Sequence, residues 1–230
     1  MYKEDEAHYL RNISTIKSLN ATKYCDLGIG FGRIAIELKK SKKNVMGVEH
    51  PGVPPENYSW AKQHNINVHL SDFFSEEMLK LPTDIDCFYL VHCIAHFRFP
   101  PHELLEVLYD KLPVGGRFYL STVNASSLTN VMKLFRGNSV TEKVNKRPSW
   151  SKPEGSIKTP WNQSGRPHIW DDWMHVKEYT LDELTTIFKE EGFEIEKAYH
   201  QNFHVHWKKS MMCKFWPHLA DECVVIGKKV

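Results

Sequence analysis

The chain has 230 residues, 41% of them apolar and 25% charged, and a formal net charge of +2 at pH 7. The length and these fractions predict one globular domain, residues 1–230, with a full hydrophobic core. The small net charge excludes a strong overall electrostatic field that would attract nucleic acid or a membrane surface. The most apolar run, residues 87–97, is too short to span a membrane. The five cysteines form no C-x-x-C pair and the first residues are too charged for a signal peptide, so we expect a cytoplasmic protein with reduced cysteines.

A leading helix is predicted over residues 5–20. Leu10, Ile13, Ile16 and Leu19 recur there at the spacing of one helical face. We expect this helix to pack on a sheet, where it could also cover a ligand site.

Residues 25–32, Cys-Asp-Leu-Gly-Ile-Gly-Phe-Gly, predict the end of a buried strand, a tight turn and the start of a helix. Glycines such as Gly28 and Gly30 let the backbone bend sharply and let a ligand approach it closely. The dinucleotide fingerprint G-x-G-x-x-G requires a glycine where Arg33 stands, which argues against an NAD-dependent oxidoreductase. Asp26 precedes the turn, and an acid there repels pyrophosphate but suits a cation such as S-adenosylmethionine (SAM).

This motif, Asp-Leu-Gly-Ile-Gly-Phe-Gly, resembles the first motif of class I SAM-dependent methyltransferases. The resemblance implies that SAM is the cofactor and that Asp26, Gly28 and Gly30 bind it. Glu49 ends the next predicted strand, residues 44–49, roughly twenty residues after the turn, where an acid can accept hydrogen bonds from both ribose hydroxyls. Glu49 also matches the family's acidic position after the second strand.

The third predicted strand, residues 66–70, is followed by Asp72 and Phe73. In the family, an acid at this point binds the adenine amino group and its neighbour packs on the ring, so the resemblance implies these roles here. Asp72 could equally be the N-cap of a turn over residues 75–81, and one carboxylate could do both.

Residues 85–91 predict a central fourth strand that is buried on both faces. His92 follows it directly, and we expect it to line the cofactor site. Many small-molecule methyltransferases carry an apolar-Glu-His-apolar element next. Here the histidine, His96, is kept and Ala95 replaces the glutamate, which leaves open a SAM-binding partner subunit without catalysis.

The resemblance extends over residues 23–199 and implies an α/β, Rossmann-like class I methyltransferase fold. This fold has a seven-stranded, mostly parallel sheet with helices on both faces. Its C-terminal third is matched most closely by residues 175–184, in which Thr180 and Glu183 predict a capping box. Further helices are expected at 32–40, 54–64, 100–112 and 126–136, and further strands at 117–124, 193–199 and 221–227.

Residues 138–174 fall outside the resemblance and predict an insertion that acts as a substrate lid. They contain four tryptophans, and residues 133–158 carry seven basic side chains against two acidic ones. We therefore expect the lid to close over a small anionic acceptor, such as a phosphorylated or nucleotide-linked sugar. The tryptophans could instead form a homodimer contact.

The expected reaction is methyl transfer, and O-methylation would need a base to take the proton of a hydroxyl. His96 and His175 are the candidates, although each could be a structural histidine. Loop residues His168, Asp171 and Asp172 could join His175 around a metal, but such clusters are common without one and no metal is predicted. The basic lid also allows RNA methylation, although strand four lacks the Pro-Pro-aromatic element of enzymes that methylate nucleic-acid amino groups, and nucleic acid is not the expected partner.

Overall fold

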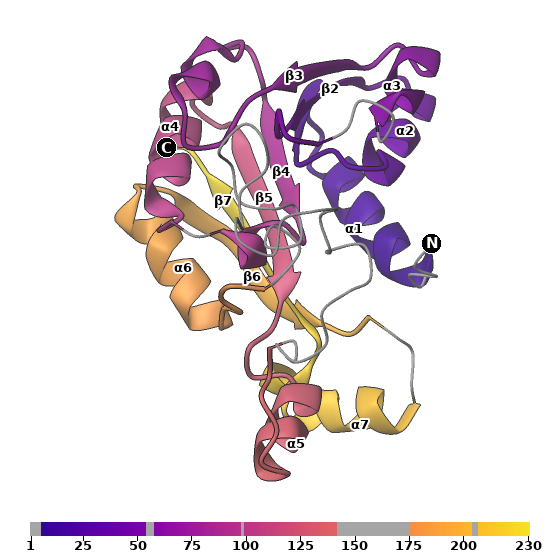
Figure 1. Cartoon of the computed structure of the whole chain (residues 1–230), viewed down its shortest axis with the longest axis vertical. Helices are drawn as coiled ribbons and strands as arrows, with labels where there is room; N and C mark the ends of the chain where they lie inside the picture. The colour runs from indigo at the N-terminus through magenta and orange to yellow at the C-terminus, as the bar shows by residue number, and fades with distance from the viewer. Residues whose placement is uncertain (1–5, 54–57, 98, 142–174, 204–206) are drawn as a thin grey trace, which may run out of the picture.

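The computed structural model describes residues 6–53, 58–97, 99–141, 175–203 and 207–230 (Figure 1). Seven strands form one sheet in the order β3-β2-β1-β4-β5-β7-β6. All neighbouring strands are parallel except that β7 runs antiparallel to both β5 and β6. The predicted sheet is therefore confirmed. The strands are β1 (Lys23–Leu27), β2 (Asn44–Glu49), β3 (Asn67–Leu70), β4 (Cys87–Val91), β5 (Arg117–Val123), β6 (Glu194–Gln201) and β7 (Glu222–Lys228).

Helices cover both faces of the sheet (Figure 1). On one face lie α1 (Glu6–Ser18), α2 (Arg33–Lys40) and α3 (Trp60–Gln63), and on the other lie α4 (His102–Lys111) and α6 (Leu181–Glu190). Beyond the carboxyl end of β5, α5 (Leu128–Phe135) and α7 (Trp207–Phe215) lie at the same end of the molecule (Figure 1). Short 3-10 turns complete the described elements: η2 (Glu76–Lys80), η3 (Ile94–His96) and η6 (Pro217–Leu219).

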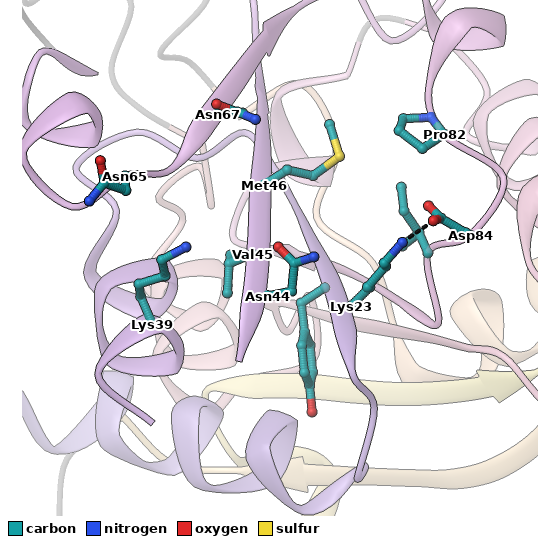
Figure 2. Close-up of a pocket in the computed structure, with 11 residues that line it drawn as sticks. Lys23, Lys39, Asn44, Val45, Met46, Asn65, Asn67, Pro82 and Asp84 are labelled. Carbon is teal, nitrogen blue, oxygen red and sulfur yellow. Dashed lines mark hydrogen bonds and ion pairs between the residues drawn. The ribbon is translucent and has the colours of Figure 1, made fainter. Parts of the chain in front are cut away.

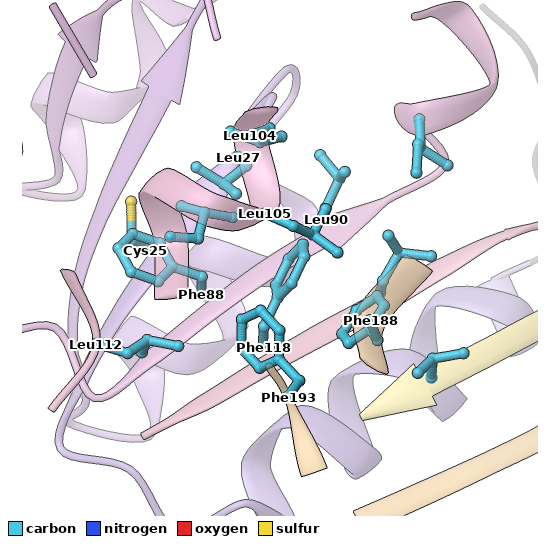
Figure 3. Packing of buried hydrophobic residues seen from close by; sticks show 14 of the residues in the cluster. Cys25, Leu27, Phe88, Leu90, Leu104, Leu105, Leu112, Phe118, Phe188 and Phe193 are labelled. Atoms are coloured by element: carbon cyan, nitrogen blue, oxygen red, sulfur yellow. The ribbon is translucent and has the colours of Figure 1, made fainter. Parts of the chain in front are cut away.

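The core consists of two apolar layers, one on each face of the sheet, because alternate residues of each strand point to opposite faces. Figure 3 shows the layer beneath α4 and α6. There the Phe118 ring of β5 stacks on the Phe188 ring of α6, with 5.2 Å between the ring centroids. On the opposite face, three buried tyrosines, one from each of β1, β4 and β5, pack beneath α1 and α2. The central strands are buried on both faces, which leaves their carboxyl ends as the place where polar groups can meet a ligand.

The helix ends follow the local sequence. The capping box at Thr180 forms in both directions, with the Glu183 carboxylate accepting from the Thr180 backbone N–H and the Thr180 hydroxyl accepting from the Glu183 N–H. Gly192, at φ +84°, ends this helix in the left-handed conformation that glycine adopts most readily.

The helix expected over 126–136 forms as α5, with Phe135 85% exposed. Two other regions differ from the expectations. No element was predicted for the segment that forms α7. The helix expected over 54–64 is shorter, with α3 beginning at Trp60 and residues 54–57 outside the described chain. None of the described helices is long and apolar enough to cross a membrane.

Candidate functional site

The glycine turn after β1 is bent by three left-handed glycines that alternate with other residues. Gly28, Gly30 and Gly32 have φ angles of 74°, 47° and 66°. The N–H groups of Gly28 and Ile29 both donate to the carbonyl oxygen of Val48, at 2.9 and 3.1 Å. The turn is thereby fastened to β2, and side chains larger than hydrogen would strain its backbone.

Neighbouring side chains approach the turn so closely that a Cβ atom would collide at Gly32 and make a tight contact at Gly28. A Cβ on Gly32 would lie 1.8 Å from the Trp60 ring, and one on Gly28 would lie 3.1 Å from Cys93 Sγ. The Trp60 indole N–H also donates to the Gly30 carbonyl at 3.1 Å. Trp60 was missed by the sequence analysis, which read its segment only as a helix.

Glu49 joins the turn to the ends of two strands. Its side chain is buried, with 7% of the residue exposed. Oε2 accepts from the Gly30 N–H at 2.8 Å, and Oε1 accepts from the His50 N–H at 2.9 Å. The Glu49 carbonyl accepts from the Ser71 N–H at 3.0 Å, which ties β2 to the residue after β3. The acid expected at the ribose therefore lies beside the glycine turn in a fixed orientation.

Asp72 and Phe73 lie on the same edge of the sheet. Asp72 is 51% exposed at its side chain, and its Oδ1 accepts from the Phe74 N–H at 3.1 Å. It does not cap η2, whose N-cap residue is Ser75, so the N-cap alternative for Asp72 is wrong. A Cβ on Gly28 would lie 4.0 Å from the Phe73 ring, so this ring reaches toward the turn.

Asp26 is a buried acid with an altered proton affinity. It is 6% exposed, and this burial raises its pKa to about 8, against the opposing influence of the nearby Tyr89 hydroxyl and with a further upward contribution from Glu49. The Tyr89 hydroxyl is buried without a properly aligned hydrogen-bond partner among the described residues. A positive charge near this pair would favour ionised Asp26, which makes the site suitable for a cation.

His92 pairs with a carboxylate from the far end of the chain. Its Nε2 lies 2.9 Å from Oε1 of Glu222, which begins β7 and is fully buried. Asn12 of α1 and Gln201 of β6 also donate to the Glu222 carboxylate. The sequence analysis missed Glu222, because nothing in a local pattern links residues that are 130 positions apart.

The two histidines predicted as bases lie together. The ring centroids of His96 and His175 are 5.0 Å apart. The Ala95 carbonyl accepts from the Val176 and Lys177 N–H groups at 2.7 and 3.2 Å, and this holds the segment after residue 174 against η3. Glu178, which the sequence analysis also missed, has its Oε1 3.3 Å from His175 Nδ1.

Two cavities lie at opposite ends of the sheet. A cavity of about 300 Å³ lies beyond the carboxyl end of β5, lined by Asn130, Lys133, Glu178 and Phe203 among others. A larger one of about 470 Å³ lies at the amino ends of β1 and β2, where Lys23 pairs with Asp84 (Figure 2). The smaller cavity lies at the carboxyl ends of the strands, where parallel α/β sheets bind ligands, and its lining includes Glu178 but no residue of the glycine turn.

Most of the predicted lid, residues 142–174, lies outside the described residues, as do the loop residues considered for a metal before His175. Within the described ranges, no group of three or more His, Cys, Asp or Glu side chains is arranged to hold a metal ion.

Comparison with known proteins gives one family match. The family described as "Methyltransferase domain" matches residues 4–198. Solved structures with a similar fold include a SAM-dependent methyltransferase from Archaeoglobus fulgidus (14% identity, TM-score 0.62, 99% of this chain and 95% of that chain). A Thermotoga maritima SAM-dependent methyltransferase, described as a possible histamine N-methyltransferase, has 18% identity and a TM-score of 0.60 over 96% of this chain and 89% of that chain.

The third structure, phosphoethanolamine N-methyltransferase 2 of Haemonchus contortus in complex with SAM, has 14% identity and a TM-score of 0.55, and the match covers 96% of this chain and 52% of that chain. No curated protein matches the chain.

The close contact between Gly32 and Trp60 predicts that adding one methyl group at residue 32 destabilises the fold. Gly32→Ala should lower the free energy of unfolding by about 1–3 kcal/mol more than Gly137→Ala, because overpacking adds to backbone strain. Gly137 is the matched control, since its φ of 68° is nearly that of Gly32 and nothing lies within 4 Å of its Cβ position. Urea unfolding measures both, and equal losses would contradict the close packing.

The raised pKa of Asp26 predicts a pH-dependent stability. Between about pH 4 and the folded-state pKa of about 8, the folded chain keeps a proton that the unfolded chain releases, so this group makes the free energy of unfolding fall as pH rises. Asp26→Asn should remove this fall, measured by urea unfolding at pH 5 and pH 8.

Asp86 is the control for this measurement. Burial alone would raise the pKa of Asp86, but hydrogen bonds from the Lys23 and Thr22 N–H groups lower it below its ordinary value. Its contribution to stability is present above the unfolded pKa and is lost as pH falls below it. Asp86→Asn should therefore lower the free energy of unfolding by the same amount at pH 5 and at pH 8. An Asp26→Asn variant that behaves in this way would contradict the raised pKa.

Proposed function

The chain belongs to the family of SAM-dependent methyltransferases, and we propose that it transfers the SAM methyl group to an oxygen of a small polar acceptor. SAM supplies an electrophilic methyl carbon on a sulfonium that is already a good leaving group. The protein therefore has to bind the cofactor, exclude water, place the acceptor in line with the methyl group and receive a proton.

One observation carries the cofactor part of the proposal: the Glu49 carboxylate, fixed 2.8 Å from the Gly30 N–H at the carboxyl edge of the sheet. Each of its two oxygens already accepts one backbone hydrogen bond and keeps a second lone pair. Two neighbouring ribose hydroxyls match this pattern, because each can donate to one oxygen. Phe73 and Asp72 then lie on the adjacent strand end, where we propose that the adenine binds.

Asp26 and its surroundings fit the cationic part of the cofactor. Without a bound cation, burial raises the pKa of the Asp26 carboxyl. The nearby Tyr89 hydroxyl lacks an aligned hydrogen-bond partner among the described residues. The glycine turn leaves no room for a side chain at Gly32 and little at Gly28. We propose that Asp26, Gly28 and Gly30 contribute to binding the methionine part of SAM, with the peptide of His92 on the opposite side of the turn.

We propose that the acceptor binds between His92, which pairs with Glu222, and the neighbouring rings of His96 and His175. His96 and His175 face each other 5.0 Å apart, and Glu178 joins His175 to the cavity beyond β5. The basic excess in residues 133–158 supports an anionic acceptor such as a sugar phosphate or nucleotide sugar. RNA methylation and SAM binding without catalysis are the competing outcomes.

Calorimetry with S-adenosylhomocysteine and Glu49→Gln tests the cofactor site. The variant should bind about 1–3 kcal/mol more weakly, because buried hydroxyls lose a charged acceptor. Glu37→Gln, on the exposed side of α2 where Glu37 pairs with Lys40, should bind like the wild type. Wild-type protein that binds NAD but not S-adenosylhomocysteine, or a Glu49→Gln variant with unchanged affinity, would contradict the proposal.

Methyl transfer to a panel of sugar phosphates, nucleotide sugars and short RNAs tests the acceptor. His96→Ala and His175→Ala should each lower kcat at least about tenfold, because a misplaced acceptor loses alignment with the methyl group. Their affinity for S-adenosylhomocysteine should stay within about twofold of wild type. His102→Ala, on the exposed outer surface of α4, is the control. Full activity of both variants would remove His96 and His175 from the site, and transfer to RNA alone would replace the small-molecule acceptor.

A further inference from the structure

Glu222 is a buried carboxylate that is contacted by side chains from α1, from β6 and from the residue after β4. No part of its side chain is exposed. It accepts hydrogen bonds from Asn12 of α1 and Gln201 of β6, and it lies 2.9 Å from Nε2 of His92, just after β4. The Tyr119 hydroxyl of β5 donates to the Asn12 side chain and so extends the network. A carboxylate is buried at a high desolvation cost, so a network that holds one in place is a candidate for function.

The network sets the protonation pattern of the His92 ring. Two side-chain amides donate to the Glu222 carboxylate, which favours its ionised form. With Glu222 ionised, the carboxylate can only accept hydrogen bonds, and His92 Nε2 then carries the hydrogen that points at Glu222. In the neutral ring, the other nitrogen, Nδ1, then holds the lone pair. Glu222 would also stabilise the imidazolium that forms when Nδ1 takes a proton.

His92 lies between the proposed cofactor and acceptor positions. Its neighbour Cys93 packs against Gly28 of the turn, where a Cβ would lie 3.1 Å from Sγ. On the other side, the His92 ring is 5.3 Å from the ring of Phe203, which lines the cavity beyond β5. The His92 side chain is 22% exposed, in contrast to Glu222, so the ring reaches from the buried network to the surface of the site.

The backbone of His92 is held in an unfavourable conformation. Its φ of 55° lies in the left-handed region, which is uncommon for residues other than glycine. The His92 N–H donates to the Ser121 carbonyl at 2.9 Å, so the sheet fixes this conformation at the end of β4. Strained residues of this kind persist where the surrounding structure determines them, and they are common at active sites.

We propose that His92 is the general base of the methyl transfer and that Glu222 is its positioning residue. This inference rests on the proposed function, and it assigns His96 and His175 to holding the acceptor. The acceptor hydroxyl gives its proton to His92 Nδ1 while its oxygen forms a bond to the methyl carbon. The bond from that carbon to sulfur breaks, and its electron pair stays on sulfur and neutralises the sulfonium. The proton then leaves His92 for solvent.

The other histidine–carboxylate pair is less suited to this role. His175 lies 3.3 Å from Glu178, and it faces His96 rather than the glycine turn. The Glu178 carboxylate is shared with Asn130 of α5 and is partly exposed. Its distance to the imidazole is longer and its burial is less complete than in the His92–Glu222 pair, so it orients the ring less firmly.

The first test reads the His92 tautomer without any turnover. In ¹⁵N-labelled protein saturated with S-adenosylhomocysteine, the signals of His92 are identified by their loss in His92→Gln. We expect neutral His92 to carry its hydrogen on Nε2. A ring protonated on Nδ1 could not accept the acceptor's proton there, and this result would overturn the inference whatever the activity.

The second test measures kinetics on the acceptor that the panel identifies. His92→Gln can still donate to Glu222 but cannot act as a base, so kcat should fall by about 10²–10⁴-fold. The affinity for S-adenosylhomocysteine and the melting temperature should stay near wild type. Glu222→Gln should lower kcat more than it raises KM. His102→Gln is the matched control, because His102 also pairs with a carboxylate, Glu190 at 3.0 Å, on the exposed surface.

The outcomes separate the two proposals. Suppose that the wild type binds S-adenosylhomocysteine and methylates an acceptor, while His92→Gln keeps kcat within about threefold of wild type. This change is far smaller than the loss expected of a general base, so only this inference would fail. If the wild type neither binds S-adenosylhomocysteine nor methylates any member of the panel, the proposed function fails and takes this inference with it.

Discussion

The hydrogen bond from the Gly30 N–H to the Glu49 carboxylate is the interaction on which the proposed cofactor site depends. The two preceding N–H groups of the turn, those of Gly28 and Ile29, donate to the Val48 carbonyl. Val48 and Glu49, two neighbouring residues of β2, therefore orient the whole glycine turn. The Trp60 indole closes it from α3. Because these contacts join the turn to two other elements, the proposed SAM site is held in place before the ligand arrives, and little ordering cost remains to weaken binding.

The carboxyl edge of the sheet concentrates buried acids that perform different tasks because their surroundings differ. Asp26 lacks strong donors and its pKa rises, Glu49 accepts backbone N–H groups, and Glu222 accepts from three side chains. Acids held in environments this different are typical of sites where charge develops or moves. In our account the first two serve a cationic cofactor, and the third steadies the histidine that receives a proton.

Local patterns predicted the sheet and the helix ends, because periodicity, glycine turns and capping residues act over a few positions. They also placed Asp26 and Glu49 at strand ends. They failed where the partner is remote in sequence: Trp60 over Gly32, and Glu222 beside His92, are tertiary contacts that only the fold creates. The exposure of Phe135 on α5 could not be predicted from the sequence either, because helical spacing reports amphipathicity, whereas exposure depends on what covers the face.

A crystal structure of the protein with S-adenosylhomocysteine tests the central claim most directly. The account predicts the ligand across the carboxyl ends of β1, β2 and β4, with both ribose hydroxyls within about 2.6–3.2 Å of the Glu49 carboxylate oxygens. Soaking Glu49→Gln crystals under the same conditions should give weaker density at the same place. A ligand bound elsewhere, for example in the cavity beside Lys23 at the opposite end of the sheet, or a ribose that does not contact Glu49, would contradict it.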